Sequence, residues 1–289
     1  MARTILIAGA TGQQGGAVLE ALKSTPEFSN SSLSIRAIAR DPTAASKKLG
    51  STNISFHKAN LTDQASLEAA MAGVDAAFLI TIPIPNPEAE VTQGKTFIDA
   101  AKAAGVKYIV FSSVGSAERN TGVPHFESKR VVEKYLEESG IAHSIIRPVA
   151  FMDNFPLQGL GRFFALGMFK TFLGNKRVQL IAVKDIGVFG AKALIDPVYW
   201  TGKEVELAGD DKSVKEILDV YQKVQGSRPW IAWLPYLLLK LMLPTDIFLM
   251  FKFFYEDGYK ADIPELQKLH PALMSLEDFL SETSKSKRT

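Results

Sequence analysis

The chain has 289 residues, of which 46% are hydrophobic, and its 33 basic and 31 acidic residues leave a net charge of +2. This length allows one large domain or a main domain with a smaller appendage, and the near balance of charge gives no reason to expect nucleic acid as a partner. The absence of cysteine excludes disulfides and thiolate metal sites, and the four scattered histidines have no metal-ligand spacing, so we expect no metal.

The first half of the chain alternates short β-branched runs with amphipathic stretches of helical length. The runs predict strands at Thr4–Ala8, Ser34–Ala39, Ile54–Lys58, Ala76–Thr81, Lys107–Ser112 and Ala142–Arg147. The stretches predict helices at Gly15–Ser24, Asp63–Ala72, Glu88–Ala104 and Phe126–Ser139. Strict alternation indicates βαβ units, so we expect an α/β fold: a Rossmann-type doubly wound parallel sheet with helices on both faces.

The pattern changes after Pro148. Residues 151–182 are rich in phenylalanine and glycine, strands are predicted at Val178–Val183 and Glu204–Leu207, and a helical pattern begins near Ser213. We therefore predict a dinucleotide-binding Rossmann domain over 1–150 and a smaller, mainly helical substrate-side region over 151–289. Part of that region, near 178–209, is expected to return to the main sheet.

The most apolar segment covers residues 230–254. Prolines and charged residues interrupt it, so no run reaches the roughly 18–20 apolar residues needed to span a bilayer. We interpret it as buried amphipathic helices that line or cover a pocket, with a peripheral membrane contact as the alternative. The N-terminus lacks a signal-peptide pattern, and we expect a cytoplasmic monomer or dimer that acts on a small-molecule substrate.

A glycine-rich turn stands at the first strand–helix junction. Its glycines are spaced GxxGxxG, and this spacing allows a tight turn, close approach of a pyrophosphate and packing of the helix on the strand. The helix start then offers free N–H groups and the positive end of its dipole to phosphates. The residues expected to bind a dinucleotide here are Gly9, Thr11, Gly12, Gln13, Gln14 and Gly15.

Arg40 ends the second predicted strand, where a carboxylate would favour NAD and a cation favours the 2′-phosphate of NADP. The adjacent Asp41 could serve a ribose, but with Pro42 after it Asp41 is better interpreted as a helix N-cap. We therefore predict NADP(H) as the cofactor. Asn60 and Leu61, which follow the third strand, are expected near its adenine.

Several motifs together resemble the NmrA-like family of atypical short-chain dehydrogenases/reductases. They are Gly9-Ala10-Thr11-Gly12-Gln13-Gln14-Gly15-Gly16, Arg40-Asp41-Pro42, Phe111-Ser112-Ser113, His125-Phe126-Glu127-Ser128-Lys129, Arg147-Pro148, Asp153-Asn154-Phe155, Val183-Lys184-Asp185-Ile186-Gly187 and Leu276-Glu277-Asp278-Phe279-Leu280. The resemblance spans nearly the whole chain and implies an NAD(P)-binding Rossmann fold. It does not specify one function, because the family contains reductases, NADP(H)-responsive regulators without known turnover, and relatives with redox-neutral chemistry.

The resemblance also implies a catalytic site with one departure. Short-chain dehydrogenases place a proton-donating tyrosine four residues before a lysine that orients the nicotinamide ribose. Here the lysine is Lys129 but the tyrosine position holds His125. The imidazole could transfer a proton at neutral pH, or it could be a packing residue in a protein that has lost its donor. Ser113 stands near the usual catalytic serine and could equally be a strand-end cap.

The remaining candidates border the nicotinamide end of the site, since ligands bind at the carboxyl ends of the strands. The loop Thr81-Ile82-Pro83-Ile84-Pro85 is expected to form one wall, and Val149 is expected to contact the cofactor. A substrate pocket is predicted at Phe151, Met152, Asn154 and Phe155, although aromatic residues there could simply pack in the core.

These features favour an NADPH-dependent reductase of a small, partly apolar carbonyl, imine or enone. The missing tyrosine keeps two alternatives open: a redox sensor or regulator without turnover, and a redox-neutral enzyme that holds NADP(H) as part of its pocket.

Overall fold

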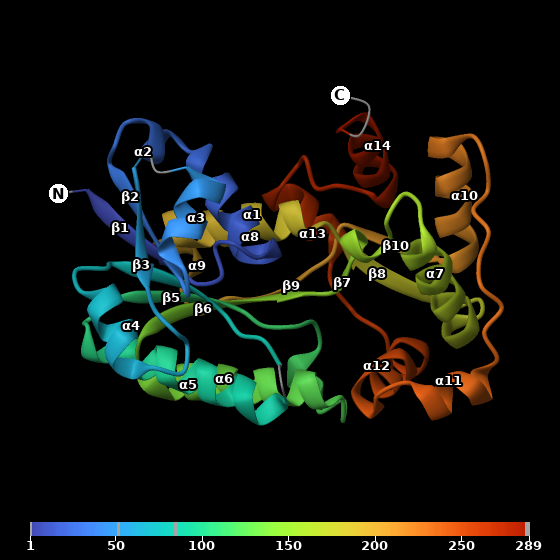
Figure 1. Cartoon of the computed structure of the whole chain (residues 1–289), viewed down its shortest axis with the longest axis horizontal. Coiled ribbons are helices and arrows are strands. Elements are labelled where there is room, and N and C mark those ends of the chain that lie inside the picture. Colours follow the sequence, from blue (N-terminus) through green and yellow to red (C-terminus); the bar gives the residue numbers. More distant parts are fainter. Residues whose placement is uncertain (1, 51–52, 84–85, 287–289) are drawn as a thin grey trace.

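The main sheet forms the expected α/β Rossmann architecture. The structure is a computed structural model that describes residues 2–50, 53–83 and 86–286. Its main sheet has seven parallel strands in the order β3-β2-β1-β4-β5-β6-β9 (Figure 1). The strands are β1 (Arg3–Ile7), β2 (Leu33–Ala39), β3 (Ile54–Lys58), β4 (Ala76–Ile80), β5 (Tyr108–Ser112), β6 (Ala142–Pro148) and β9 (Glu204–Leu207). The predicted fold class is therefore confirmed, and the first six strands lie within one residue of their predicted bounds.

Helices cover both faces of this sheet. On one face lie α1 (Gln13–Lys23) and α8 (Val183–Ile195), and on the other lie α4 (Gln64–Met71), α5 (Pro87–Ala103) and α6 (Pro124–Ser139) (Figure 1). Alternate residues of β1 supply the two cores: Ile5 and Ile7 face α1 and α8, whereas Leu6 faces α4 and α5. The remaining helices of this part are α2 (Pro26–Ser29), α3 (Pro42–Leu49) and α9 (Pro197–Trp200).

Side-chain caps fix where several of these helices begin. The Asp41 carboxylate accepts a hydrogen bond from Ala44 N at 3.0 Å, with Pro42 at the first helical position, so the predicted N-cap is confirmed. Asn86 caps α5 in the same way through Ala89 N, at 2.9 Å.

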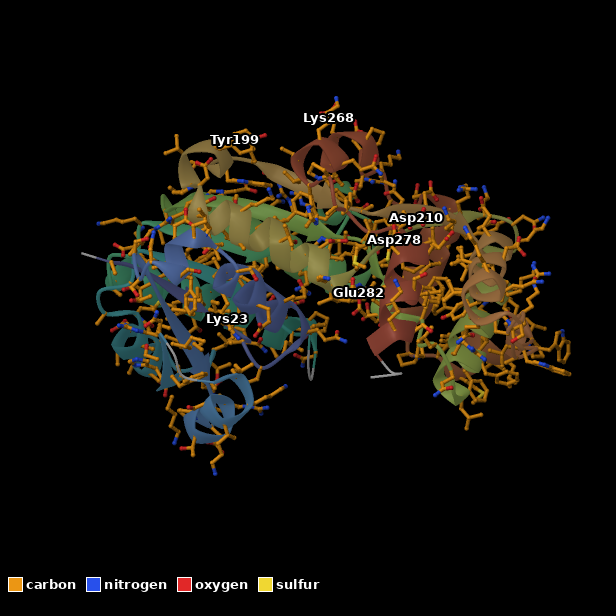
Figure 2. The ribbon with its side chains drawn as sticks, turned by 90° about the horizontal axis from the view of Figure 1, so that it is seen from above. Lys23, Tyr199, Asp210, Lys268, Asp278 and Glu282 are labelled. Carbon is orange, nitrogen blue, oxygen red and sulfur yellow. The ribbon has the colours of Figure 1, made fainter. Side chains whose placement is uncertain are left out.

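A smaller lobe follows β6. Its three-stranded sheet has the order β10-β8-β7, formed by β7 (Ala150–Phe151), β8 (Arg177–Ile181) and β10 (Asp210–Ser213). Asp210 of β10 connects this sheet to α14, because its carboxylate accepts a hydrogen bond from Leu276 N at 2.9 Å. Figure 2 shows Asp210 beside Asp278 of α14. The helices of the lobe are α7 (Leu160–Leu173), α10 (Val214–Gln225), α11 (Tyr236–Met242), α12 (Thr245–Glu256), α13 (Ile263–Leu269) and α14 (Leu276–Ser286). Two short 3-10 helices lie at Ala117–Arg119 and Met152–Asn154.

Residues 178–209 divide between the two sheets. Strand β9 pairs with β6 at the edge of the main sheet and α8 packs on that sheet, whereas β8 belongs to the smaller sheet. The strand predicted through Val183 ends at Ile181, because Val183 begins α8 and donates its N–H to the Asp153 carboxylate at 2.9 Å. A Cβ at Gly187 would lie 2.4 Å from the backbone of Ala17, so glycine permits the close contact of α8 with α1.

The apolar segment 230–254 is buried only in part. Helix α12 buries Phe251, Phe253 and Phe254 in the core of the smaller lobe. Helix α11 exposes most of its apolar side chains, so between residues 230 and 242 the prediction of burial holds for Ala232 and Leu239 and is wrong for most of the others. No helix among the described residues is long and apolar enough to cross a membrane.

Candidate functional site

The predicted site residues gather along one edge of the main sheet. Because its strands are parallel, the loops after them meet at the carboxyl edge. Following the strand order from β3 to β6, this edge carries Asn60, Arg40, the Gly9–Gly15 turn, Thr81, Ser113 and Val149. The strand order reverses between β1 and β4, because the chain proceeds from β1 outward to β3 on one side and from β4 outward to β6 on the other. A doubly wound sheet binds its ligand at such a reversal.

The glycine turn has the close contacts that only glycine allows. Gly9 has a φ of +66°, and Gly12 N donates to Gly9 O at 2.8 Å. A Cβ at Gly15 would lie 2.4 Å from Gly9 O, so the start of α1 rests directly on the turn. Gly12 supplies no side-chain cap, and the first turn of α1 contains no acidic residue. The backbone N–H groups at the start of α1 are therefore neither capped by a side chain nor paired with a carboxylate of the first turn.

Basic side chains flank this turn on the side of β2. Arg40 is exposed at the end of that strand, and Lys48 of α3 donates to Thr11 O at 2.9 Å. Asn60 is also exposed, with its Oδ1 accepting from Thr62 N at 3.2 Å, and Leu61 is partly buried beside it. The neighbouring carboxylate, Asp41, is engaged as an N-cap, so the arrangement favours an anion beside Arg40.

Lys129 is anchored by the protein itself. Its Nζ lies 2.7 Å from Glu90 Oε1 and donates to Thr81 Oγ1 and Thr81 O at 3.2 and 3.3 Å. Glu90 is completely buried and Lys129 is only 8% exposed. An ammonium group has three hydrogens, and these three acceptors use them all. Lys129 thus joins α6 to the loop after β4, and a direct bond to a ribose would require one of these contacts to break.

The loop after β4 is held at a second point. Gln93 of α5 accepts from Ile82 N at 3.1 Å and donates to Ile82 O at 3.2 Å, and this leaves the Ile82 side chain half exposed. Pro83 is partly buried. Ile84 and Pro85, the rest of the expected wall, lie outside the described residues.

His125 lies at the start of α6 and pairs with a residue that sequence analysis did not identify. Its Nδ1 is 2.7 Å from Asp246 Oδ1, and its backbone N donates to the same oxygen at 3.2 Å. Since a carboxylate oxygen only accepts, the ring hydrogen is on Nδ1. In the neutral ring Nε2 then carries no hydrogen and can accept a proton but not donate one. The pair also joins α6 to α12 of the smaller lobe.

Ser113 is buried away from this pair. Its side chain lies against Glu133, with no hydrogen bond of good geometry to any described residue, and its N–H donates to Ile146 O at 2.8 Å. Glu133 accepts two hydrogen bonds from Arg147, each of 2.9 Å. Ser113 thus lies next to an ion pair, and no side-chain hydrogen bond joins it to His125 or Lys129 in the described part of the chain.

Met152 and Phe155, two of the predicted pocket residues, pack in the core. Met152 is 0% and Phe155 1% exposed in the core of the smaller lobe, which is the packing role also considered above. Phe151 is partly buried and Asn154 is exposed, so these two can contact a ligand without rearrangement. Val149 is buried after β6, and its N–H donates to Leu207 O at 3.2 Å.

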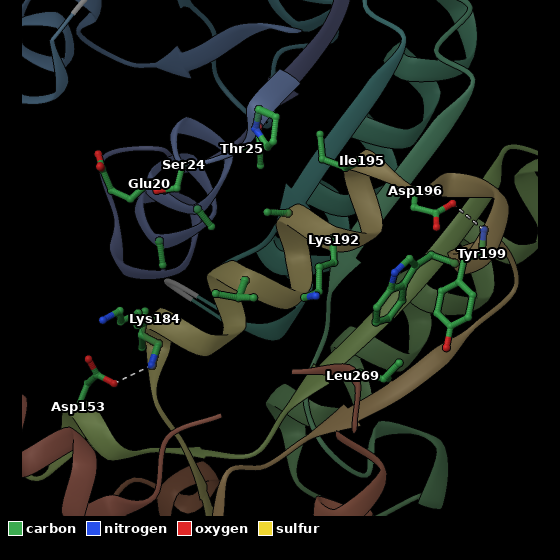
Figure 3. A pocket seen from close by; sticks show the side chains of 17 residues that line it. Glu20, Ser24, Thr25, Asp153, Lys184, Lys192, Ile195, Asp196, Tyr199 and Leu269 are labelled. Atoms are coloured by element: carbon green, nitrogen blue, oxygen red, sulfur yellow. Dashed lines mark hydrogen bonds between the residues drawn. The ribbon is translucent and has the colours of Figure 1, made fainter. Parts of the chain in front are cut away.

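A groove of about 1060 Å³ lies on the outer face of α1 and α8, away from this edge. Figure 3 shows it running from Lys184 and Asp153 to Tyr199 and Leu269. None of the predicted site residues lines it. Among the described residues no group of three or more histidine or acidic side chains is arranged to hold a metal ion.

The sheet order and the glycine turn define a Rossmann-type α/β protein. The family model described as the NmrA-like family matches residues 1–280, so the chain belongs to the NmrA-like family. It is 32% identical to Quinone oxidoreductase 2 of Escherichia coli (strain K12), over 71% of this chain and 68% of that protein. It is 30% identical to the NAD(P)H azoreductase of Xenophilus azovorans, over 67% of this chain and 64% of that protein.

Solved structures agree with this assignment. An NADPH-dependent quinone oxidoreductase from Escherichia coli, complexed with NADPH, superposes with a TM-score of 0.78 at 27% identity, and the match covers 96% of this chain and 99% of that one.

Proposed function

We propose that this protein is an NADPH-dependent reductase of conjugated, largely apolar acceptors, of which quinones are the type. The observation that carries the proposal is the His125–Asp246 pair in the position where the related dehydrogenases hold a hydroxyl donor. An enzyme without a strong proton donor is suited to acceptors whose reduced form is a weakly basic anion. Similarity to a quinone oxidoreductase and an azoreductase supports this class of acceptor.

The sheet edge fits NADP(H) along its whole length. The uncapped start of α1 suits the pyrophosphate, and the contact of Gly15 with Gly9 leaves the backbone accessible to it. Arg40 would pair with the 2′-phosphate, while Lys48 holds the turn through Thr11 O. Asn60 and Leu61 would border the adenine. The nicotinamide would then lie beside the loop after β4, near Val149.

Lys129 acts in this proposal through the loop that it holds. Its bonds to Thr81 and Glu90 fix the wall on which the nicotinamide rests, and Gln93 fixes the same wall at Ile82. Lys129 is thus a positioning residue. Phe151 and Asn154 are the accessible residues on the opposite lobe that would contact the acceptor.

The proposed choice of acceptor depends on how basic the reduced acceptor is before it takes up its proton. When bound, NADPH would supply a hydride (two electrons and one hydrogen nucleus) to the acceptor, and one further proton would complete the reduction. A quinone becomes a phenolate, whose conjugate acid has a pKa of about 10 as in tyrosine, so water can supply the proton. A saturated ketone becomes an alkoxide, which is about as basic as hydroxide and far more basic than a phenolate, so its formation needs a positioned donor.

A matched pair of acceptors tests the proposal. With purified protein and NADPH, we expect 1,4-naphthoquinone to be reduced at least about 100-fold faster than 2-tetralone, which has the same bicyclic skeleton but an unconjugated carbonyl. The measurement is NADPH absorbance, corrected for the reaction without protein. Equal turnover of both compounds would show that a proton donor exists. Tight NADPH binding without turnover of any quinone, azo or enone compound would instead identify a sensor.

The variant His125→Phe tests the source of the proton within the same assay. We expect kcat/KM for the quinone to stay within about tenfold of the unmodified protein, because water delivers the proton. A loss of about 10²–10⁴ would make His125 the donor.

The cofactor preference is expected to depend on Arg40. Calorimetric titration should show NADPH binding at least about tenfold tighter than NADH, a difference of about 1.4 kcal/mol, because the guanidinium pairs with the 2′-phosphate. Arg40→Ala should remove the preference while leaving NADH affinity unchanged. Lys47→Ala, on the next helix, is the matched loss of one positive charge and should keep it. Equal affinities in the unmodified protein would refute the assignment.

A further inference from the structure

The smaller lobe carries an apolar surface that the protein leaves uncovered. Five side chains of the segment 230–242 are between 71% and 87% exposed, whereas solvent-exposed surfaces are normally depleted of such clusters. We call them the docking face: Trp230, Trp233, Leu237, Leu241 and Met242. Leu160 and Phe164 on the neighbouring helix α7 are exposed as well. Figure 1 shows α11 at the outer end of the smaller lobe, away from the main sheet.

The segment beneath this face is firmly attached. Ala232 N donates to Phe163 O at 3.1 Å, and Thr171 Oγ1 donates to Leu234 O at 2.8 Å. A Cβ at Gly167 would lie 2.6 Å from Ala232 O, so the segment lies directly on α7. In α11 the buried side chain is Leu239, which leaves Leu237 and Leu241, about one turn apart, on the outer side. The exposure is therefore a property of a fixed surface.

The charges around the docking face are positive. From residue 220 to residue 245 the chain contains Lys223, Arg228 and Lys240 and no acidic residue. Lys240 is exposed on α11 itself, and Lys170 is exposed on α7. Two of these cations are paired, Lys223 with Glu277 of α14 at 2.6 Å and Arg228 with Asp219 at 2.8 Å. On α12, Asp246 pairs with His125 and Glu256 with Lys252. Among the described residues Lys240 and Lys170 form no ion pair, so these two lysines are the cations that the docking face offers to an anionic partner.

We propose that the docking face binds the surface of an anionic lipid bilayer. The tryptophans of the segment before α11 and the leucines on α11 can enter the interface between headgroups and acyl chains, and lysines beside them attract anionic headgroups. Tryptophan in particular prefers this interface, because its ring is apolar and its N–H is polar. A second protein molecule would fit less well, since a two-fold contact would place the Lys240 side chains of both copies in one interface.

The tryptophans provide the measurement. Of the three in the chain, Trp200 is 3% exposed, whereas Trp230 and Trp233 are nearly fully exposed. Titration of the full chain with vesicles of phosphatidylcholine and phosphatidylserine should therefore shift the fluorescence to shorter wavelength and carry the protein with floated vesicles. Vesicles of phosphatidylcholine alone should bind markedly less.

Charge variants locate the contact. Leu237→Glu/Leu241→Glu should weaken vesicle binding at least about tenfold, and Lys240→Gln by about fivefold. Val198→Glu is the matched control: Val198 is 93% exposed on α9, next to Tyr199 on the main-sheet lobe (Figure 2), and its replacement should leave binding unchanged. Circular dichroism of each variant verifies its fold.

Three results would overturn the proposal. They are absence of binding to the anionic vesicles, equal binding by Leu237→Glu/Leu241→Glu, and a concentration-dependent dimer in sedimentation equilibrium that the same double variant abolishes. The proposal does not rest on the reductase assignment, because vesicle binding is measured without cofactor or acceptor.

Discussion

Glu90→Gln is expected to destabilise the protein by about 3–5 kcal/mol, because it leaves the Lys129 ammonium buried without its counter-charge. Glu90 is completely buried and is hydrogen-bonded to Lys129, Thr81 and Ser128. Urea unfolding at neutral pH gives the loss. NADPH affinity should also fall by about tenfold, since the loop after β4 loses its anchor, and calorimetric titration measures this.

Two further variants separate the stability effect from the binding effect. Glu88→Gln removes an exposed carboxylate from the first turn of the same helix and should cost less than about 0.5 kcal/mol. Glu90→Leu/Lys129→Met replaces the pair by apolar side chains and should recover most of the stability. The double variant should still bind NADPH weakly, because no ammonium holds Thr81. If Glu90→Gln and Glu88→Gln have the same free energy of unfolding, the buried ion pair does not stabilise the fold.

Local sequence patterns were sufficient for the Rossmann part of the fold. The first six strands and the helices between them follow hydrophobic periodicity and caps such as Asp41, which act over a few residues. The glycine turn was identifiable for the same reason, because its contacts lie between Gly9 and Gly15. The smaller lobe was harder. Strand β10 has the polar sequence Asp-Asp-Lys-Ser, which no β propensity indicates, and its pairing with β8 is set by distant residues.

The partners of the site residues required the structure. Glu90 lies 39 positions before Lys129, and Asp246 lies 121 positions after His125, so no local pattern links them. The family motif predicted a direct contact between Lys129 and the cofactor. It could not show that the fold places two oxygens of Thr81 and one of Glu90 within hydrogen-bond distance of the ammonium group. Burial was predicted for α11 because its sequence is apolar. The sequence does not show whether another part of the chain packs on the helix, and in the structure most of its apolar side chains remain exposed.

Glu133→Gln is the second variant with a large expected effect, about 1.5–3 kcal/mol at neutral pH, because it removes charge-assisted hydrogen bonds to Arg147, which keeps its ion pairs with Glu118 and Glu204. Burial alone would raise the pKa of Glu133, but the hydrogen bonds and charge of Arg147, helped by Arg130, outweigh it and lower the pKa. The same contact raises the pKa of Arg147. Because no side-chain hydrogen bond or ion pair joins Glu133 or Arg147 to Lys129 or His125 in the described part of the chain, we expect NADPH affinity to change little in this variant, in contrast to Glu90→Gln.

The pH dependence of unfolding tests whether the stability loss in Glu133→Gln comes from removing the charge of the Glu133 carboxylate. A carboxyl group whose pKa is lowered by folding stabilises the protein fully above its unfolded pKa of about 4.3, and this stabilisation is lost as the pH falls through the folded value. The difference in unfolding free energy between the unmodified protein and Glu133→Gln should therefore be constant from pH 7 to about 5 and shrink below about 4. Glu137→Gln is the matched control, one turn further along α6, since its partly exposed carboxylate also pairs with Arg130, at 2.9 Å. It should cost at most about 1 kcal/mol. A loss in Glu133→Gln that stays constant below pH 4 would assign the effect to packing, because protonation would then leave it unchanged.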